Sequence, residues 1–217
     1  MGGTMRHLSA GLLSFCLAVP VAHAQPCCGP ITPVGQRLAQ FLDSSNVATL
    51  WQSGWHVNWR TGEKDHATPG GPEARTHCSA FVAAMAERLG IYLLRPPDHP
   101  QNLLANAQMR WLREQGTTFG WRALATPVGA QAAANRGEFV LEAFENSDPH
   151  RPGHIAIVRP SEKTREALDR EGPQETQAGE QNATSISTAA GFRHHRGAWA
   201  TGGSGGLRYY VHEVNWP

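Results

Sequence analysis

The chain has 217 residues, 40% of them hydrophobic, with 19 Lys and Arg against 18 Asp and Glu. This length is typical of one domain with a sizeable core, and the apolar content excludes a disordered chain. A formal net charge of +1 argues against a dedicated nucleic-acid binder, whose affinity rests on many contacts between basic side chains and phosphates. Apolar runs outside the N-terminus are too short for a membrane span.

Residues 1–24 have the layout of a secretory signal peptide rather than of a folded element. A weakly basic start leads into an apolar run at 12–19, and the segment ends in Val-Ala-His-Ala at 21–24. We therefore predict that residues 1–24 are removed and that 25–217 form a single secreted or periplasmic domain. The alternative is a buried N-terminal helix.

The mature chain would contain three cysteines, which is an odd number. Cys27 and Cys28 are adjacent, and they either pair with each other, pair with a partner chain or stay free. Cys78 is left over, and a single thiol outside any disulfide framework is the first indication of function.

The first half of the mature chain is predicted to be mainly helical. Thr32 and Pro33 are typical of a helix start, and apolar residues then recur at helical spacing. The Gly-, Pro- and charge-rich segment 60–75 is expected to be a surface loop. The predicted helices are the one beginning at Pro33 and those at 76–89, 100–114 and 129–135.

Strands follow, because the pattern changes to short runs rich in β-branched and aromatic residues. We predict strands at 138–144, 154–158, 174–178 and 207–214. The charged segment 161–172 is expected to be a solvated helical excursion with little to bury. Helices followed by a run of strands indicate an α+β fold.

Cys78 falls in the first turn of the predicted helix at 76–89. The unpaired N–H groups and the positive end of the helix dipole favour a thiolate at this position. A nucleophilic thiolate also needs a histidine that carries a proton to the leaving group. A lone Cys at a helix start is more often a small buried filler, so Cys78 alone does not establish an active site.

His154 is the best of the eleven histidines for that role. It opens a strand directly after Gly153, where an imidazole can face a cleft, although a lone His at a strand start is usually a satisfied surface residue. Gln177, Glu180 and Asn182 are each candidates to orient its ring. Gln177 is preferred, because Gly179 and the polar run after it indicate that the strand has ended before Glu180.

Several runs together resemble the secreted papain-like cell-wall hydrolases of the NlpC and CHAP types. Thr-His-Cys-Ser-Ala-Phe-Val at 76–82 resembles their nucleophile helix, and Gly-Glu-Phe-Val at 137–140 and Gly-His-Ile-Ala-Ile-Val at 153–158 resemble two of their strands. Gln-Ala at 177–178 falls at the NlpC His-Ala pair, and Glu-Gln-Asn at 180–182 is similar to the CHAP Glu-x-Asn. The resemblance covers residues 76–182, about half of the chain.

The resemblance implies a Cys-bearing helix packed on a small antiparallel sheet, and hydrolysis of amide or peptide bonds in peptidoglycan through a thioester. Cys78 would be the nucleophile, His154 the base and then the acid, and Gln177 the residue that orients the imidazole. The enzyme would act as a monomer, with peptidoglycan or a muropeptide as its partner and without a cofactor or metal.

Departures from the family pattern are the Thr-His pair before Cys78 and the charged insertion at 161–172. Rival functions are a catalytically silent module that binds cell-wall glycopeptide and a protease that acts on ordinary polypeptide.

Other candidates receive simpler interpretations. Asn58 and Trp59 are weak candidates for a second oxyanion donor beside the backbone N–H of Cys78. His77 is expected to be exposed. His150 and the pair at 194–195 lack a Glu or Cys at ligand spacing, so no zinc site is predicted.

Overall fold

The computed structural model describes residues 1–3, 26–65, 76–203 and 205–216. Nearly all of the predicted signal peptide, and residues 66–75 of the predicted surface loop, lie outside this part of the chain. Within it, the protein is an α+β fold with six α-helices and a six-stranded antiparallel sheet. The described residues include no helix long and apolar enough to cross a membrane.

The helices follow the predicted order, with shifted boundaries. They are α1 (Pro33–Asp43), α2 (Cys78–Arg88), α3 (Leu104–Glu114), a 3₁₀ turn (Gly116–Phe119), α4 (Pro127–Asn135), α5 (Arg165–Glu171) and α6 (Thr188–Gly191). The side chain of Thr32 caps α1, as predicted, and Thr126 caps α4 in the same way. The short α6 and the 3₁₀ turn were not predicted, because neither is long enough to show an apolar period.

The strands are β1 (Arg122–Leu124), β2 (Phe139–Phe144), β3 (His154–Val158), β4 (Gln174–Gln177), β5 (Ala183–Ser187) and β6 (Arg208–His212). Their order across the sheet is β1-β6-β2-β3-β4-β5. Four of them confirm predicted strands, whereas β1 and β5 were missed. Both missed strands are edge strands without a fully buried residue, so their sequences lack the apolar alternation that identifies a strand.

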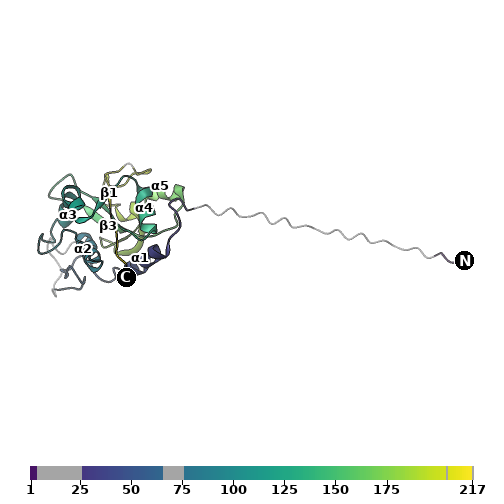
Figure 1. The fold of residues 1–217 in the computed structure, drawn as a ribbon, viewed down its shortest axis with the longest axis horizontal. Coiled ribbons are helices and arrows are strands. Elements are labelled where there is room, and N and C mark those ends of the chain that lie inside the picture. Colours follow the sequence, from purple (N-terminus) through teal and green to yellow (C-terminus); the bar gives the residue numbers. More distant parts are fainter. Residues whose placement is uncertain (4–25, 66–75, 204, 217) are drawn as a thin grey trace.

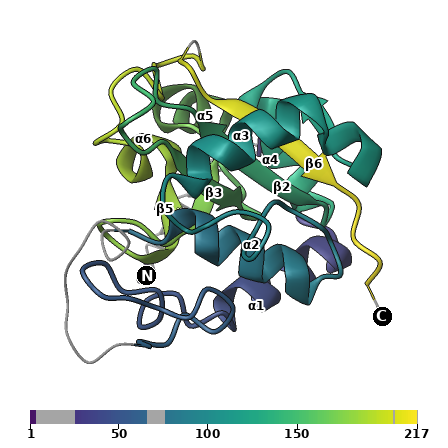
Figure 2. The same ribbon diagram turned by 90° about the vertical axis from the view of Figure 1, so that its left-hand side faces the viewer.

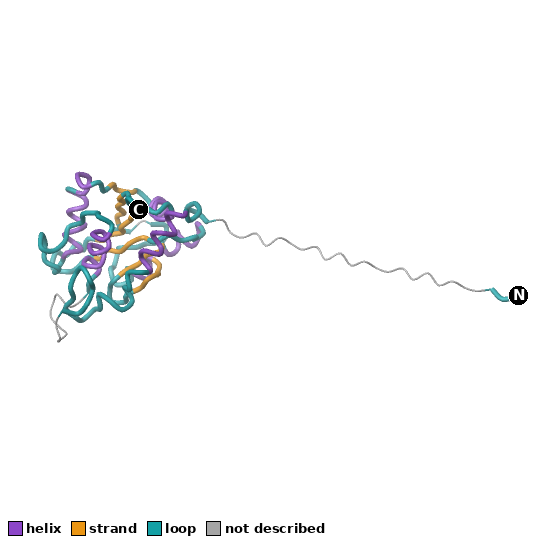
Figure 3. Tube along the Cα trace, turned by 60° about the horizontal axis from the view of Figure 1, so that its bottom comes forward, coloured by secondary structure: helices purple, strands orange, loops and turns teal. Residues whose placement is uncertain are grey.

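The centre of the sheet is covered on both faces. Every residue of β3 is buried, and successive side chains of a strand point to opposite faces. Helices α2 and α3 lie on one side of the strands, and α1, α4 and α5 lie on the other (Figure 1). Figure 3 shows helices on both sides of the strands. This three-layer arrangement places the start of α2 against β3 (Figure 2).

The sequence of α2 explains why it can lie so deep in the molecule. Its first nine residues are all buried, and four of them are alanines, whose small side chains allow close approach to the sheet. A helix that is apolar all round is stable only inside a protein. The first nine residues of α2 are therefore covered on every side, and Cys78 at the first position is buried with them.

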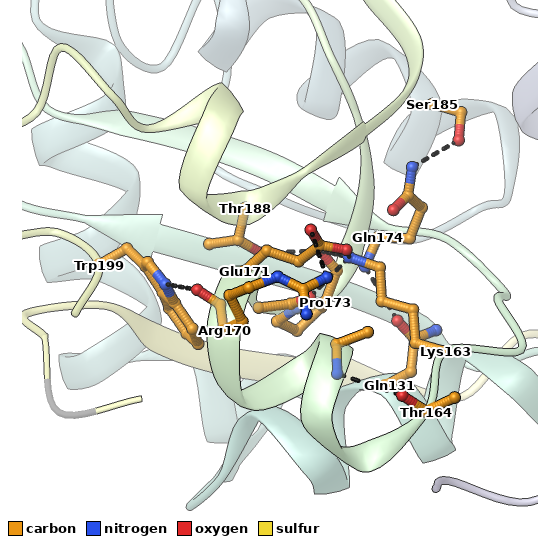
Figure 4. A network of polar contacts seen from close by, with 12 residues as sticks. Gln131, Lys163, Thr164, Arg170, Glu171, Pro173, Gln174, Ser185, Thr188 and Trp199 are labelled. Atoms are coloured by element: carbon orange, nitrogen blue, oxygen red, sulfur yellow. Dashed lines mark hydrogen bonds and ion pairs between the residues drawn. The ribbon is translucent and has the colours of Figure 1, made fainter. Parts of the chain in front are cut away.

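The charged segment 161–172 is more integrated than predicted. It does contain a helix, α5, but Leu168 is fully buried. The side chain of Lys163 is only 8% exposed, and its Nζ pairs with Glu171 Oε1 at 3.2 Å. Nζ also donates to the carbonyl oxygen of Gly172 at 2.8 Å. Figure 4 shows Lys163 and Glu171 within this network of polar contacts. The predicted helical excursion between two strands is confirmed by α5, and most of its residues are exposed or half-buried. Lys163 and Leu168 are the exceptions, because their side chains enter the fold.

Two buried carboxyl groups lie near this segment. Glu142 on β2 and Glu175 on β4 are both inaccessible to solvent, and Thr188 Oγ1 lies 2.8 Å from Glu142 Oε2. Neither oxygen of Glu175 accepts a hydrogen bond from the described residues. Burial raises the pKa of Glu175 well above its usual range, and the neighbouring Glu142 carboxylate raises it further. Of the two carboxyl groups, Glu175 is therefore the one that stays protonated.

We expect Glu175→Gln to stabilise the protein increasingly as pH rises from 5 to 8. A group whose pKa is raised by folding contributes stability below its unfolded pKa and loses it as pH rises toward the folded pKa. The amide cannot ionise, so the variant avoids that loss. Thermal unfolding at several pH values measures the effect, with Glu166→Gln on the exposed start of α5 as control. A difference in melting temperature that does not change with pH would contradict the assignment.

Candidate active site

Cys78 is the first residue of α2, and its sulfur lies at the start of β3. The thiol is free and 4% exposed. The backbone N–H groups of Ile155, the residue after His154, and of Cys78 and Ser79 at the helix start act on the sulfur, and each lowers the pKa of the thiol. The predicted cysteine and histidine therefore come from two elements that meet at this point. The other two cysteines of the predicted mature chain, Cys27 and Cys28, form a disulfide with each other.

The expectation of a resting thiolate at Cys78 is wrong. Burial raises the pKa of the thiol to about 11, and the three N–H groups oppose this shift only in part. The sequence correctly predicts that Cys78 lies at the start of a helix, but it does not predict how deeply α2 is buried. Since desolvation outweighs the helix terminus, the resting group is a thiol.

Gly153 and its surroundings position His154 at the start of β3. A Cβ at Gly153 would collide with the backbone oxygen of Phe144 and with Asn106 Oδ1, so only glycine fits here. The side chain of Asn106 accepts from Asn146 N at 3.1 Å and donates to the carbonyl oxygen of Arg151 at 2.9 Å. Both ends of the β2–β3 connection are thus fixed before His154 enters the sheet.

The ring of His154 is held by Gln177, as predicted. His154 Nε2 lies 2.6 Å from Gln177 Oε1, and Gln177 Nε2 donates to the carbonyl oxygen of Gln181 at 3.0 Å. The second contact fixes the orientation of the amide, so its oxygen must face the histidine. A carbonyl oxygen only accepts, and Nε2 therefore carries the proton. The neutral imidazole is left with an unprotonated Nδ1.

The alternative orienting residues do not contact His154. Glu180 pairs with His194 at 3.1 Å, and its side chain is 62% exposed. Asn182 is used to hold the 47–51 loop, since its Nδ2 donates to the carbonyl oxygens of Val47 and Leu50. The choice of Gln177 over Glu180 and Asn182 therefore agrees with the geometry.

Two aromatic rings enclose His154, and the sequence did not identify either as part of the site. His195 stacks on it with ring centroids 5.0 Å apart and an interplanar angle of 11°. Phe192 meets it edge-on at 4.6 Å. Burial lowers the pKa of His154 to about 3, His195 adds to this effect, and the Gln177 hydrogen bond opposes it. His195 follows α6, and only the fold brings it back to β3.

Three other sequence expectations can be placed. His77 was expected to be exposed, but it is buried, with 2% of its surface accessible. Its Nε2 is hydrogen-bonded to the carbonyl oxygen of Trp55 at 2.8 Å. Asn58 is exposed and its Oδ1 accepts from the backbone N–H of Arg60. Neither Asn58 nor Trp59 lines a cavity at the site, so their assignment as oxyanion donors is wrong.

Two adjoining cavities open at the site. One, of about 340 Å³, is lined by Cys78 and Ser79 together with the 101–105 segment before and at the start of α3. The other, of about 290 Å³, is lined by His154, Gln177 and the 179–181 and 193–195 segments. Both include Thr76, His150 and Gly153, so they share a wall. We call them the Cys78 cavity and the His154 cavity.

The fold and the site together define an α+β protein in which a helix-start cysteine lies close to Ile155, the residue after a histidine that is held by a glutamine. No protein-family model matches the chain, and no curated protein sequence matches it. The described residues hold no group of three or more His, Cys, Asp or Glu side chains arranged to bind a metal ion.

We expect iodoacetamide to label Cys78 slowly at neutral pH, at a rate that rises continuously from pH 7 to pH 10. The reason is that only the small thiolate fraction reacts, and the pKa of the buried thiol is about 11. The rate is measured by mass spectrometry of the labelled peptide. The urea-unfolded chain is the control, with a midpoint near the ordinary thiol value of about 8.5. A rate in the folded protein that is already constant between pH 5 and pH 8 would instead indicate a resting thiolate–imidazolium pair.

Proposed function

We propose that the protein is a secreted cysteine hydrolase of the papain-like type that cleaves amide or peptide bonds in peptidoglycan. The observation that carries the reaction type is the junction of α2 and β3. There the backbone N–H of Ile155 lowers the pKa of the Cys78 thiol, and His154, the residue before Ile155, is held by Gln177 with Nδ1 unprotonated. The choice of peptidoglycan rests on the likeness of residues 76–82, 137–140 and 153–158 to the NlpC and CHAP motifs.

The first half of the reaction forms a thioester. As the Cys78 sulfur attacks the substrate carbonyl carbon, its proton passes to His154, so the charges develop in the transition state rather than in the resting enzyme. The carbonyl oxygen becomes an oxyanion, for which the N–H groups of Cys78 and Ser79 at the start of α2 are the candidate donors. His154 then gives the proton to the leaving nitrogen, the C–N bond breaks, and the amine departs.

The second half uses water. His154, neutral again, accepts a proton from a water molecule, whose oxygen attacks the thioester carbon. The C–S bond breaks, the acyl part leaves as a carboxylic acid, and the proton on His154 returns to the Cys78 sulfur. Gln177 acts throughout by keeping the ring in one tautomer and one orientation. Phe192 and His195 limit the access of water to the imidazole.

The experiment that tests this function uses the purified mature chain and purified peptidoglycan sacculi. We expect soluble fragments whose masses show one cleaved amide bond and the addition of one water molecule. Sedimentation of the protein with sacculi without release of fragments would support the binding-module alternative. Cleavage of unfolded polypeptide such as casein, with intact sacculi left unchanged, would support the protease alternative.

A further inference from the structure

The His154 cavity differs in charge from the Cys78 cavity. Arg151 and Arg193 line the His154 cavity, together with the imidazoles of His150, His194 and His195. The Cys78 cavity is lined by neutral side chains apart from His150, which the two cavities share. The two arginines therefore place positive charge on the His154 side of the site.

Among the described residues, neither of the two guanidinium groups pairs with a carboxylate. Arg193 bonds only to neutral acceptors, Gln181 Oε1 at 3.3 Å and the carbonyl oxygen of Ala190 at 3.2 Å. Arg151 forms no ion pair with any Asp or Glu that the structure describes. Arg110, by contrast, reaches Glu145 at 2.8 Å. Other described arginines without an ion pair to a carboxylate, among them Arg37, Arg196 and Arg208, line neither cavity. Arg151 and Arg193 are thus distinguished by the cavity that they share.

The cavity contains one carboxylate of its own, Glu180. Its Oε2 lies 3.1 Å from His194 Nε2, so it faces an imidazole and not an arginine. The two arginines are permanently charged and leave an excess of positive charge over Glu180. A guanidinium is suited to bind a carboxylate through paired hydrogen bonds.

The chemistry of the proposed hydrolysis decides which part of the substrate meets this charge. The nucleophile forms a bond to the acyl carbon, whereas the histidine delivers a proton to the leaving nitrogen. The Cys78 cavity therefore receives the acyl side of the bond, and the His154 cavity receives the amine side.

We propose that the His154 cavity is a carboxylate-binding subsite for the leaving group, formed by Arg151 and Arg193. The enzyme then selects amide bonds whose amine side carries a free carboxylate, either at the end of a peptide or on the side chain of the residue next to the bond. This inference rests on the proposed function, because it assigns the leaving group through the proton transfer from His154.

The test compares monomeric muropeptides as isolated with the same muropeptides after carbodiimide coupling to ammonia, which converts free carboxylates to amides. We expect kcat/KM to be at least about tenfold higher for the unmodified muropeptides, the scale of a charge-assisted contact that is open to solvent. In the double variant Arg151→Gln/Arg193→Gln, the ratio of kcat/KM for unmodified to kcat/KM for amidated muropeptides should fall to about one. Arg196→Gln, an exposed arginine outside both cavities, is the matched control and should keep the wild-type ratio.

Synthetic peptides of the bond that is cut, amidated at one carboxylate at a time, distinguish a terminal from a side-chain carboxylate. Equal cleavage of free and amidated muropeptides by the wild type would contradict the proposed carboxylate subsite but would still support the proposed hydrolase function. If the wild type cuts neither, calorimetric binding of the two forms to Cys78→Ala separates the claims. Tighter binding of the free acid would then reject hydrolysis but support the charge recognition, and equal binding would reject both.

Discussion

Cys78→Ala and His154→Ala should each reduce the release of soluble fragments from sacculi by at least about a thousandfold. The two residues act as one unit, so the loss of either removes most of the rate that both supply. Cys78→Ser is an informative third variant, because it keeps the shape of the side chain but replaces the thiol with a much weaker nucleophile. Product release is measured by chromatography and mass spectrometry.

The control for these variants is thermal unfolding. Cys78 is a small buried side chain, so its truncation to alanine should cost about 1 kcal/mol of stability, too little to unfold the protein. Loss of activity in a variant with a near-native melting temperature assigns the effect to chemistry. Retention of wild-type activity in Cys78→Ala would remove the cysteine from the mechanism.

Gln177→Ala should lower kcat by about ten- to a thousandfold, with KM nearly unchanged. The amide oxygen fixes the proton of His154 on Nε2, and without it the ring can adopt the other tautomer or rotate away from the thiol. Loss of the contact should still leave some activity, because Phe192 and His195 continue to enclose the ring. Steady-state kinetics on a soluble muropeptide separate kcat from KM.

Glu180→Gln is the matched comparison for Gln177→Ala. Glu180 pairs with His194, so kcat of Glu180→Gln should fall far less than kcat of Gln177→Ala. KM can change in Glu180→Gln, because Glu180 lines the His154 cavity. A kcat that collapses in Glu180→Gln and is unchanged in Gln177→Ala would transfer the orienting role to the carboxylate. That outcome would also mean that the 179–182 segment takes another position when substrate is bound.

The central strands of the fold were predictable because the residues that favour them lie within the strands' own sequences. The run at 154–158 combines β-branched residues with a preceding Gly, and it forms β3 with the predicted bounds. The stripe of Phe81, Val82 and Met85 likewise identified α2. By contrast, β5 is as long as β3 but only partly buried, and its pairing with β4 depends on the fold rather than on its own side chains.

The sequence predicted which residues form the site, but it did not predict their pKa values. Position within an element indicated Cys78, His154 and the Gln177 contact, because a helix start and a strand start follow from sequence pattern. The pKa of a group depends on how much protein covers it, which no local pattern records. The same limit explains why His77 was expected to be exposed and why His195 was not connected with His154.

The most direct measurement of the central claim is the intact mass of the protein mixed with muropeptide and quenched in acid within milliseconds to seconds. We expect a transient mass increase equal to the acyl part of the substrate, located on the peptide that contains Cys78 and absent in Cys78→Ser. The adduct should persist longer in Gln177→Ala if water attack also depends on the orientation of His154. Release of cleaved product by the wild type without any covalent intermediate on Cys78 would contradict nucleophilic catalysis by this cysteine.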